Sequence, residues 1–165
     1  MVGKLLDRWP IWALVLSALI LGAAYAFQYV GQLQPCELCL KEREVWWVAL
    51  AISLVGIVAM ALPKTPMSRR GAKVALAVTL LFGAGLAAYH AGVEWKWWPG
   101  PASCTGGTTN LSIAELEQSL NRVAIPSCDA PAWVFLGLSM AGWNAIVSLI
   151  GGAFSIAAAA RRSPA

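Results

Sequence analysis

The stretch Trp12–Tyr29, WALVLSALILGAAYAFQY, decides the fold class because it contains no Asp, Glu, Lys or Arg. A run of this length meets the ~18-residue requirement for a helix that crosses the hydrocarbon of a bilayer. Further uncharged runs lie at 45–62, 74–93 and 133–160. Because lipid offers no hydrogen-bond partners to the backbone, all of these runs are expected to be helices. The sequence therefore predicts an all-α membrane protein, a four-transmembrane-helix bundle in which residues 1–165 form a single integral membrane domain.

The composition agrees with a membrane protein and argues against a nucleic-acid-binding protein. Hydrophobic residues make up 59% of the chain and charged residues 12%, against roughly 25% charged residues in soluble domains. The formal net charge is +4, but no basic stripe with interleaved aromatic residues stands outside the apolar runs. The positive excess is therefore interpreted as a topology signal, and no nucleic-acid partner is expected.

Lysine and arginine are unevenly distributed among the segments that connect the runs. One side of the membrane would carry most of them: Lys4, Arg8, Lys64, Arg69, Arg70, Lys73, Arg161 and Arg162. The positive-inside rule places this side in the cytoplasm. Both termini and the middle loop are therefore expected there, and the loops at about 31–44 and 94–131 are expected on the outer face. In a bacterium, this topology places those two loops on the periplasmic side of the inner membrane.

The first run has a second interpretation as a secretory signal. Lys4 and Arg8 precede it, and Ala24-Tyr25-Ala26 imitates a cleavage site. However, the run exceeds the usual ~7 to 15-residue core of such a signal, and further runs follow it. We expect the first helix to be retained.

All of the cysteines fall in the two outer loops. They are Cys36 and Cys39 in the first loop, and Cys104 and Cys128 in the second. The bacterial periplasm is oxidising, so thiols placed there are expected as disulfides or as parts of a redox machine. The second loop also contains a capping box, Ser112 with Glu115, which predicts a short amphipathic helix. This helix could lie on the bilayer surface or pack against the ends of the spans.

The stretch PCELCL, residues 35–40, favours a reactive dithiol. Pro35 suits the start of a helix, and thiolates in the first turn of a helix are stabilised by free backbone amides and the helix dipole. Arg43, four residues after Cys39, adds a positive charge on the same helical face. A lowered thiol pKa favours thiol–disulfide exchange at neutral pH.

Other uses of the cysteines were weighed against this interpretation. No His follows Cys39, which removes covalent c-type haem attachment. The wide spacing between Cys104 and Cys128 does not suit a zinc site, so no metal is expected. Purely structural disulfides are a stronger alternative, and they suit the second pair better than the first. A redox relay would instead carry electrons from a soluble protein to Cys104/Cys128, then to Cys36/Cys39, and then to an acceptor in the membrane.

The stretch QPCELCLKER, residues 34–43, together with a second outer cysteine pair, resembles the bacterial disulfide bond formation protein B (DsbB) family. The resemblance covers most of the chain in architecture. It implies an inner-membrane thiol:quinone oxidoreductase that reoxidises a periplasmic thioredoxin-fold dithiol oxidase of the DsbA type. The electrons would pass to a membrane quinone, ubiquinone or menaquinone.

The same resemblance implies roles for individual residues. Cys39 would be the thiolate that faces the quinone, with Cys36 as its disulfide partner. Cys104 would be attacked by the partner protein's thiol, and Cys128 would resolve or shuttle the bond. Arg43 matches the family's quinone-site arginine. His90 sits near the outer end of the third span, where quinone contact and interfacial hydrogen bonding both remain open.

Two rival functions remain at the level of sequence. The first is a non-enzymatic membrane scaffold or metal-binding adaptor whose cysteines are staples. The second is an enzyme that runs electrons the other way and reduces periplasmic proteins. That direction would normally need thiols or a donor on the cytoplasmic side, where the sequence places no cysteine.

Overall fold

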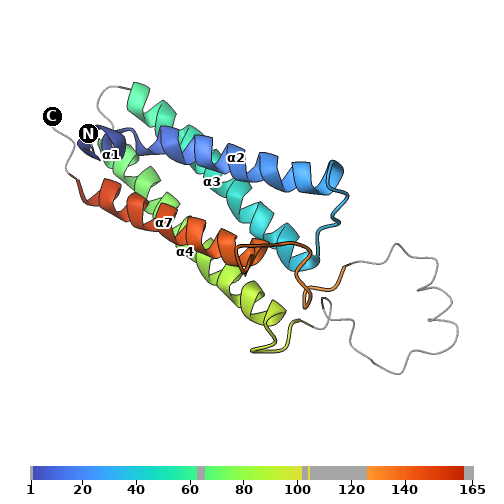
Figure 1. The fold of residues 1–165 in the computed structure, drawn as a ribbon. Helices are drawn as coiled ribbons and strands as arrows, with labels where there is room; N and C mark the ends of the chain where they lie inside the picture. Colours follow the sequence, from blue (N-terminus) through green and yellow to red (C-terminus); the bar gives the residue numbers. More distant parts are fainter. Residues whose placement is uncertain (1, 63–65, 102–103, 105–125, 162–165) are drawn as a thin grey trace, which may run out of the picture.

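The computed structural model describes residues 2–62, 66–101, 104 and 126–161. Among these residues, four helices are long and apolar enough to cross a membrane: α2 (Trp9–Tyr29), α3 (Glu37–Ala61), α4 (Pro66–Glu94) and α7 (Met140–Ala160). A short helix, α1 (Val2–Asp7), precedes them. The predicted all-α four-helix membrane bundle is confirmed. Figure 1 shows both termini at one end of the bundle and the segments that carry the cysteines at the other.

The helices pack in the order α2, α3, α4, α7. Contacts are most extensive between α4 and α7 and substantial for α2 with α3 and α3 with α4, whereas α2 and α7 barely meet. One of the few links between α2 and α7 is the hydrogen bond from Trp9 Nε1 to Ser155 Oγ, at 2.7 Å. The bundle is therefore closed on three sides and loosely closed on the fourth.

Glycines allow close approach at two helix crossings. A Cβ at Gly83 would lie 2.8 Å from Cγ1 of Val45, and a Cβ at Gly152 would lie 2.8 Å from Cδ2 of Leu81. Small residues at such crossings let helix backbones pack closely in lipid, where no hydrophobic force drives the helices together. These crossings join α3 to α4 and α4 to α7, the pairs that carry most of the site.

The fourth helix begins later than the sequence suggested. The run 133–160 was expected to be one helix, but α7 begins at Met140 and a short antiparallel hairpin precedes it. The hairpin pairs β1 (Val134–Phe135) with β2 (Leu138–Ser139). Its turn residues, Leu136 and Gly137, both have positive φ, of 52° and 80°, as two-residue hairpin turns require. The predicted amphipathic helix in the second outer loop, at 112–123, lies outside the described residues.

Candidate redox site

The first cysteine pair lies at the beginning of α3. Cys36 is the N-cap residue of this helix, and its Sγ accepts a hydrogen bond from the backbone N–H of Cys39 at 3.3 Å. The two sulfur atoms are 2.9 Å apart and both thiols are free. Cys39 therefore lies in the first turn of the helix, as predicted, whereas Cys36 is the N-cap and Pro35 precedes it.

The surroundings of Cys36 stabilise a negative charge on its sulfur. The pKa of the Cys36 thiol is lowered to about 4, mainly by the hydrogen bond from the Cys39 thiol and further by His90 and the Cys39 backbone amide, against the opposing effect of burial. His90 Nε2 lies 3.6 Å from Cys36 Sγ. In the reduced pair these contacts favour the thiolate form of Cys36. The assignment of the quinone-facing thiolate to Cys39, implied by the resemblance, stays a prediction.

The second pair forms a disulfide, Cys104–Cys128, with Cα atoms 5.2 Å apart. It is buried, and it packs in one cluster with Cys36 and Leu38, against which Cys39 also packs. The backbone N–H of Cys128 donates to the carbonyl of Cys104 at 3.0 Å. The structure thus brings all four cysteines of the sequence together.

An exposed ion pair holds the segment that carries Cys128. The Lys96 ammonium donates to the Asp129 carboxylate, and the Ser127 hydroxyl donates to the same group. These two donors, Lys96 first, hold the pKa of Asp129 below its usual range. The pair links the end of α4 to the residue after Cys128.

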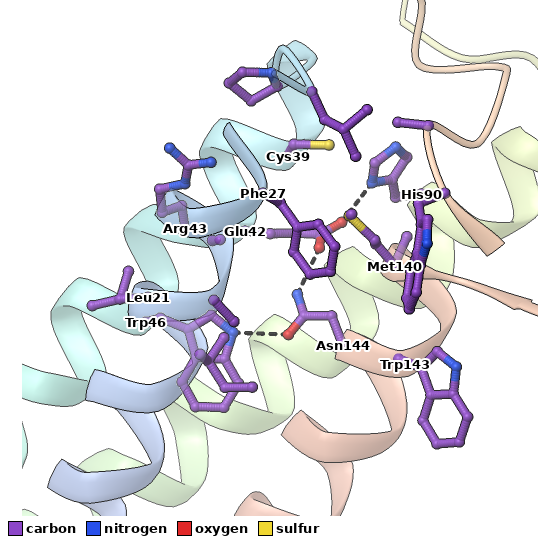
Figure 2. Close-up of a pocket in the computed structure, with 18 of the residues that line it drawn as sticks. Leu21, Phe27, Cys39, Glu42, Arg43, Trp46, His90, Met140, Trp143 and Asn144 are labelled. Atoms are coloured by element: carbon purple, nitrogen blue, oxygen red, sulfur yellow. Dashed lines mark hydrogen bonds and ion pairs between the residues drawn. The ribbon is translucent and has the colours of Figure 1, made fainter. Parts of the chain in front are cut away.

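A chain of buried hydrogen bonds joins three helices below the cysteines. Glu42 accepts from His90 Nδ1 at 2.6 Å through Oε1, and from Asn144 Nδ2 at 2.6 Å through Oε2. Asn144 Oδ1 in turn accepts from Trp46 Nε1 at 2.8 Å. Figure 2 shows Glu42 between His90 and Asn144, with Trp46 beyond Asn144. Glu42 and His90 are 7% and 2% exposed, so their mutual pairing satisfies polar groups that water does not reach.

Three members of this chain, Glu42, Asn144 and Trp46, were not assigned to the site from sequence. Glu42 lies one helical turn after Cys39, a spacing that places both on one face of α3, and this spacing was the available signal. Asn144 lies on α7, and nothing in the sequence shows which part of α3 it meets. His90, left between two roles, lies against both Cys36 and Glu42.

Arg43 lies beside this chain on α3. Its Nη1 donates to Gln28 Oε1 at 2.6 Å, and its guanidinium lies 4.6 Å from the centre of the Tyr25 ring. Its Nε is buried and has no hydrogen-bond partner among the described residues. Arg43 therefore keeps one donor available in the interior of the site.

A cavity of about 300 Å³ opens beside Cys39. Its lining includes the polar residues Cys39, Glu42, Arg43, His90 and Glu94 and the aromatic residues Phe27, Trp46, Trp133, Phe135 and Trp143. The hairpin is fixed to α7 by the hydrogen bond from Trp143 Nε1 to the Phe135 carbonyl, at 3.0 Å. The rest of the lining comes mainly from α2 and α7, with further residues from the first outer loop and from the segment before the hairpin. The cavity therefore lies where α2 and α7 make few contacts.

A reactive dithiol that adjoins a second disulfide, inside a bundle of four membrane-spanning helices, defines a membrane thiol–disulfide oxidoreductase. The comparison with protein families agrees. The family model described as disulfide bond formation protein DsbB matches residues 7–158, and the chain belongs to this family. It is a multi-pass membrane protein of disulfide bond formation.

Curated relatives support the same assignment. Disulfide bond formation protein B of Nitrosococcus oceani is 32% identical over 160 residues, which cover 93% of this chain and 91% of the relative. The protein of that name from Photorhabdus laumondii is 34% identical over 134 residues, 79% of this chain and 76% of the relative. An uncharacterized protein of Rickettsia prowazekii is 30% identical over 149 residues, 87% and 83% of the two chains.

Proposed function

We propose that this protein reoxidises a periplasmic thioredoxin-fold dithiol oxidase of the DsbA type and passes the electrons to a membrane quinone. The observation that carries the proposal is the packing of the Cys104–Cys128 disulfide against Cys36, with Cys39 on the other side facing a cavity. Such an arrangement offers one thiol pair to a protein substrate and the other to a ligand in the membrane. Both termini would lie in the cytoplasm and both pairs at the periplasmic end.

The first exchange would take place at the loop disulfide. The partner's thiolate attacks Cys104 and releases Cys128, and the partner's second thiol then displaces Cys104, which leaves the partner oxidised and the loop pair as two thiols. Cys128 next attacks Cys36 of the oxidised first pair and releases Cys39. The Cys104 thiolate then attacks Cys128 in the mixed disulfide, which closes the loop disulfide again and releases Cys36. Each exchange of two thiolate displacements thus moves two electrons from one pair to the next.

The geometry supports this direction of attack on the first pair. Cys36 belongs to the buried cluster with the loop disulfide, and Cys39 lines the cavity. The sulfur released by attack on Cys36 is therefore the one that faces the membrane ligand. The hydrogen bonds that hold charge on Cys36 in the reduced pair would also make Cys36 a good leaving group in the last exchange.

The cavity fits a quinone head group. A quinone accepts two electrons and two protons as it becomes a quinol, which returns the first pair to its disulfide. Arg43 Nε, for which the described residues offer no partner, provides a buried donor for a carbonyl oxygen, and the aromatic residues of the lining provide flat surfaces for a ring. The cavity volume lies at the lower end of the range for small-molecule sites, and apolar residues between α2 and α7 suit a lipid tail.

The test is quinone reduction followed by absorbance. Purified protein is mixed with a reduced thioredoxin-fold periplasmic oxidase and a soluble quinone analogue, using wild type, Cys39→Ser and Cys104→Ser. Wild type should turn over, Cys39→Ser should fail with quinone, and Cys104→Ser should fail with the protein substrate. If wild type does not reduce the quinone while its disulfides stay intact, the disulfides are structural and the protein is a non-enzymatic membrane scaffold.

A further inference from the structure

Three metal-binding atoms converge at the reduced first pair. Cys36 Sγ, Cys39 Sγ and His90 Nε2 all lie within 4.8 Å of one another, and Cys36 Sγ is 2.9 Å from the second sulfur and 3.6 Å from the imidazole nitrogen. Bond lengths of about 2.3 Å to sulfur and 2.0 Å to nitrogen separate neighbouring ligands of tetrahedral zinc by roughly 3.5 to 4 Å. A modest separation of the two sulfurs would therefore complete three corners of such a site.

His90 is oriented as a metal ligand requires. Its Nδ1 donates a hydrogen bond to the Glu42 carboxylate at 2.6 Å, so Nε2 faces the sulfurs and offers them a metal-binding lone pair once it gives up its proton. A carboxylate behind the imidazole is the usual support of metal-binding histidines. Glu42 is itself held by Asn144 at 2.6 Å, so the ring orientation is fixed from two helices.

Glu94, one helical turn after His90, is the candidate for a fourth donor. Its Oε1 lies 3.9 Å from His90 Nε2, and its side chain is 6% exposed. Its Oε2 is buried and has no hydrogen-bond partner within the part of the chain that the structure describes. An unpaired buried carboxylate oxygen is costly, and a bound cation would satisfy it.

We propose that the reduced first pair binds a thiophilic divalent cation of the Zn²⁺ or Cd²⁺ class through Cys36, Cys39, His90 and Glu94. Binding forms two metal–sulfur bonds and one metal–nitrogen bond and releases to solvent the protons that the two sulfurs and His90 Nε2 carry, and no oxidation state changes. A disulfide offers no thiolate, so the oxidised protein does not bind the cation. The site therefore goes beyond electron transfer: the cation holds the pair reduced and blocks its reoxidation.

This site differs from a zinc site formed by all four cysteines. Cys104 and Cys128 are joined to each other, and the donors that replace them come from α4. The proposal also stands apart from the quinone function, because it needs only a first pair that can be reduced. Failure of quinone turnover would leave it unaffected.

The experiment uses Co²⁺ as a spectroscopic probe of the full-length protein in detergent. The double variant Cys104→Ser/Cys128→Ser leaves only the first pair to reduce. After reduction and removal of the reductant, it should bind one equivalent of Co²⁺ with the visible bands of a tetrahedral site and thiolate-to-metal charge transfer. The same protein, oxidised, should show neither. Zn²⁺ and Cd²⁺ should displace the Co²⁺, and Zn²⁺ should slow oxidation of the pair by the chemical oxidant diamide.

Variants separate this site from an ordinary dithiol. Adding His90→Ala or Cys39→Ser should remove the tetrahedral spectrum, and Glu42→Gln should weaken binding by about 10- to 100-fold, as loss of a ligand's carboxylate support does. Glu94→Gln should weaken binding or change the bands, whereas the exposed Glu44→Gln is the matched control and should do neither. Unfolding of Glu94→Gln and Glu42→Gln is excluded if both variants keep the helix content of the parent protein and re-form the Cys36–Cys39 disulfide on oxidation. An absent tetrahedral spectrum in the reduced double variant, or an unchanged one with His90→Ala, would overturn the proposal.

Discussion

At the scale of single residues, Arg43 combines a fixed position with one unused donor. Gln28 and the Tyr25 ring hold the guanidinium, and within the described part of the chain Nε has no hydrogen-bond partner. Lysine keeps the charge but loses the planar fork and the stacking on an aromatic face. Arg43 is therefore a residue at which charge and geometry can be tested separately.

We expect Arg43→Lys to raise the KM for a quinone analogue about tenfold and Arg43→Ala to raise it further, because a hydrogen bond to a charged group contributes about 1.5 to 3 kcal/mol. Disulfide exchange with the partner protein should change little in both variants. Steady-state kinetics with each substrate varied in turn measure the two effects. Lys41→Ala is the control, since Lys41 is exposed and pairs with Glu37 on the surface of α3. An equal rise in KM in Lys41→Ala would show that Arg43 has no specific role in quinone binding.

Asn144 of α7 connects two residues of α3, Glu42 and Trp46, within the hydrogen-bond chain. Asn144→Leu would leave Glu42 Oε2 and Trp46 Nε1 without these partners, and each buried unsatisfied group costs about 1 to 3 kcal/mol. We expect a loss of about 2 to 4 kcal/mol in the free energy of unfolding, measured by denaturant titration in detergent.

Ser148→Ala provides the comparison for this prediction. Ser148 Oγ reaches Asn144 Oδ1 only at 3.4 Å, so its loss should cost less than about 1 kcal/mol. Equal stability of Asn144→Leu and wild type would show that water replaces the amide in this chain.

At the scale of elements, two glycines of α4 separate helix packing from helix propensity. A Cβ at Gly83 would lie 2.8 Å from Val45 of α3, whereas a Cβ at Gly85 would meet nothing within 4 Å. Gly83→Ala should destabilise the protein by about 1 to 3 kcal/mol, because overpacking forces neighbours to shift. Gly85→Ala should be neutral or stabilising by up to about 1 kcal/mol, because alanine favours a helix. Thermal unfolding of both variants measures the difference, and equal destabilisation would contradict it.

The helices could be predicted from the sequence, and the hairpin could not. Long uncharged runs specify helices because lipid leaves the backbone no other solution. The same rule misled at 133–139, where Trp133, Phe135 and Leu138 extended the apolar run although two positive-φ residues, Leu136 and Gly137, form a turn. Apolarity gave no sign that Trp133 and Phe135 line a cavity.

The site was partly predictable for a similar reason. The cysteines and Arg43 could be identified because their types and spacing carry chemistry along one helix. The contacts of Glu42 with His90 and Asn144 depend on how α3 is rotated and shifted against α4 and α7. Packing at positions such as Gly83 and Gly152 sets that geometry, and it is not encoded in any local pattern.

At the scale of the whole molecule, both termini lie at one end of the bundle and the cysteines at the other. The distribution of Lys and Arg predicts that the end with the termini is cytoplasmic. A green fluorescent protein fused to the C-terminus should therefore fluoresce, and alkaline phosphatase at the same place should be inactive. Phosphatase fused after Gly100 should be active. The reverse pattern would contradict the proposed topology and place the cysteines in a reducing compartment.

The burial of the loop disulfide has a consequence for selectivity. Cys104 and Cys128 are 4% and 1% exposed, and the Lys96–Asp129 pair holds the adjacent segment. A small thiol such as glutathione meets almost no sulfur surface, whereas a docking protein can use its binding energy to displace that segment. The rates at which glutathione and a thioredoxin-fold dithiol reduce the loop disulfide, measured by stopped flow, should differ by orders of magnitude. Lys96→Ala should make this difference in rate smaller. The fold would then prevent the loop disulfide from oxidising small thiols such as glutathione. The disulfide would react only with a protein that docks against it.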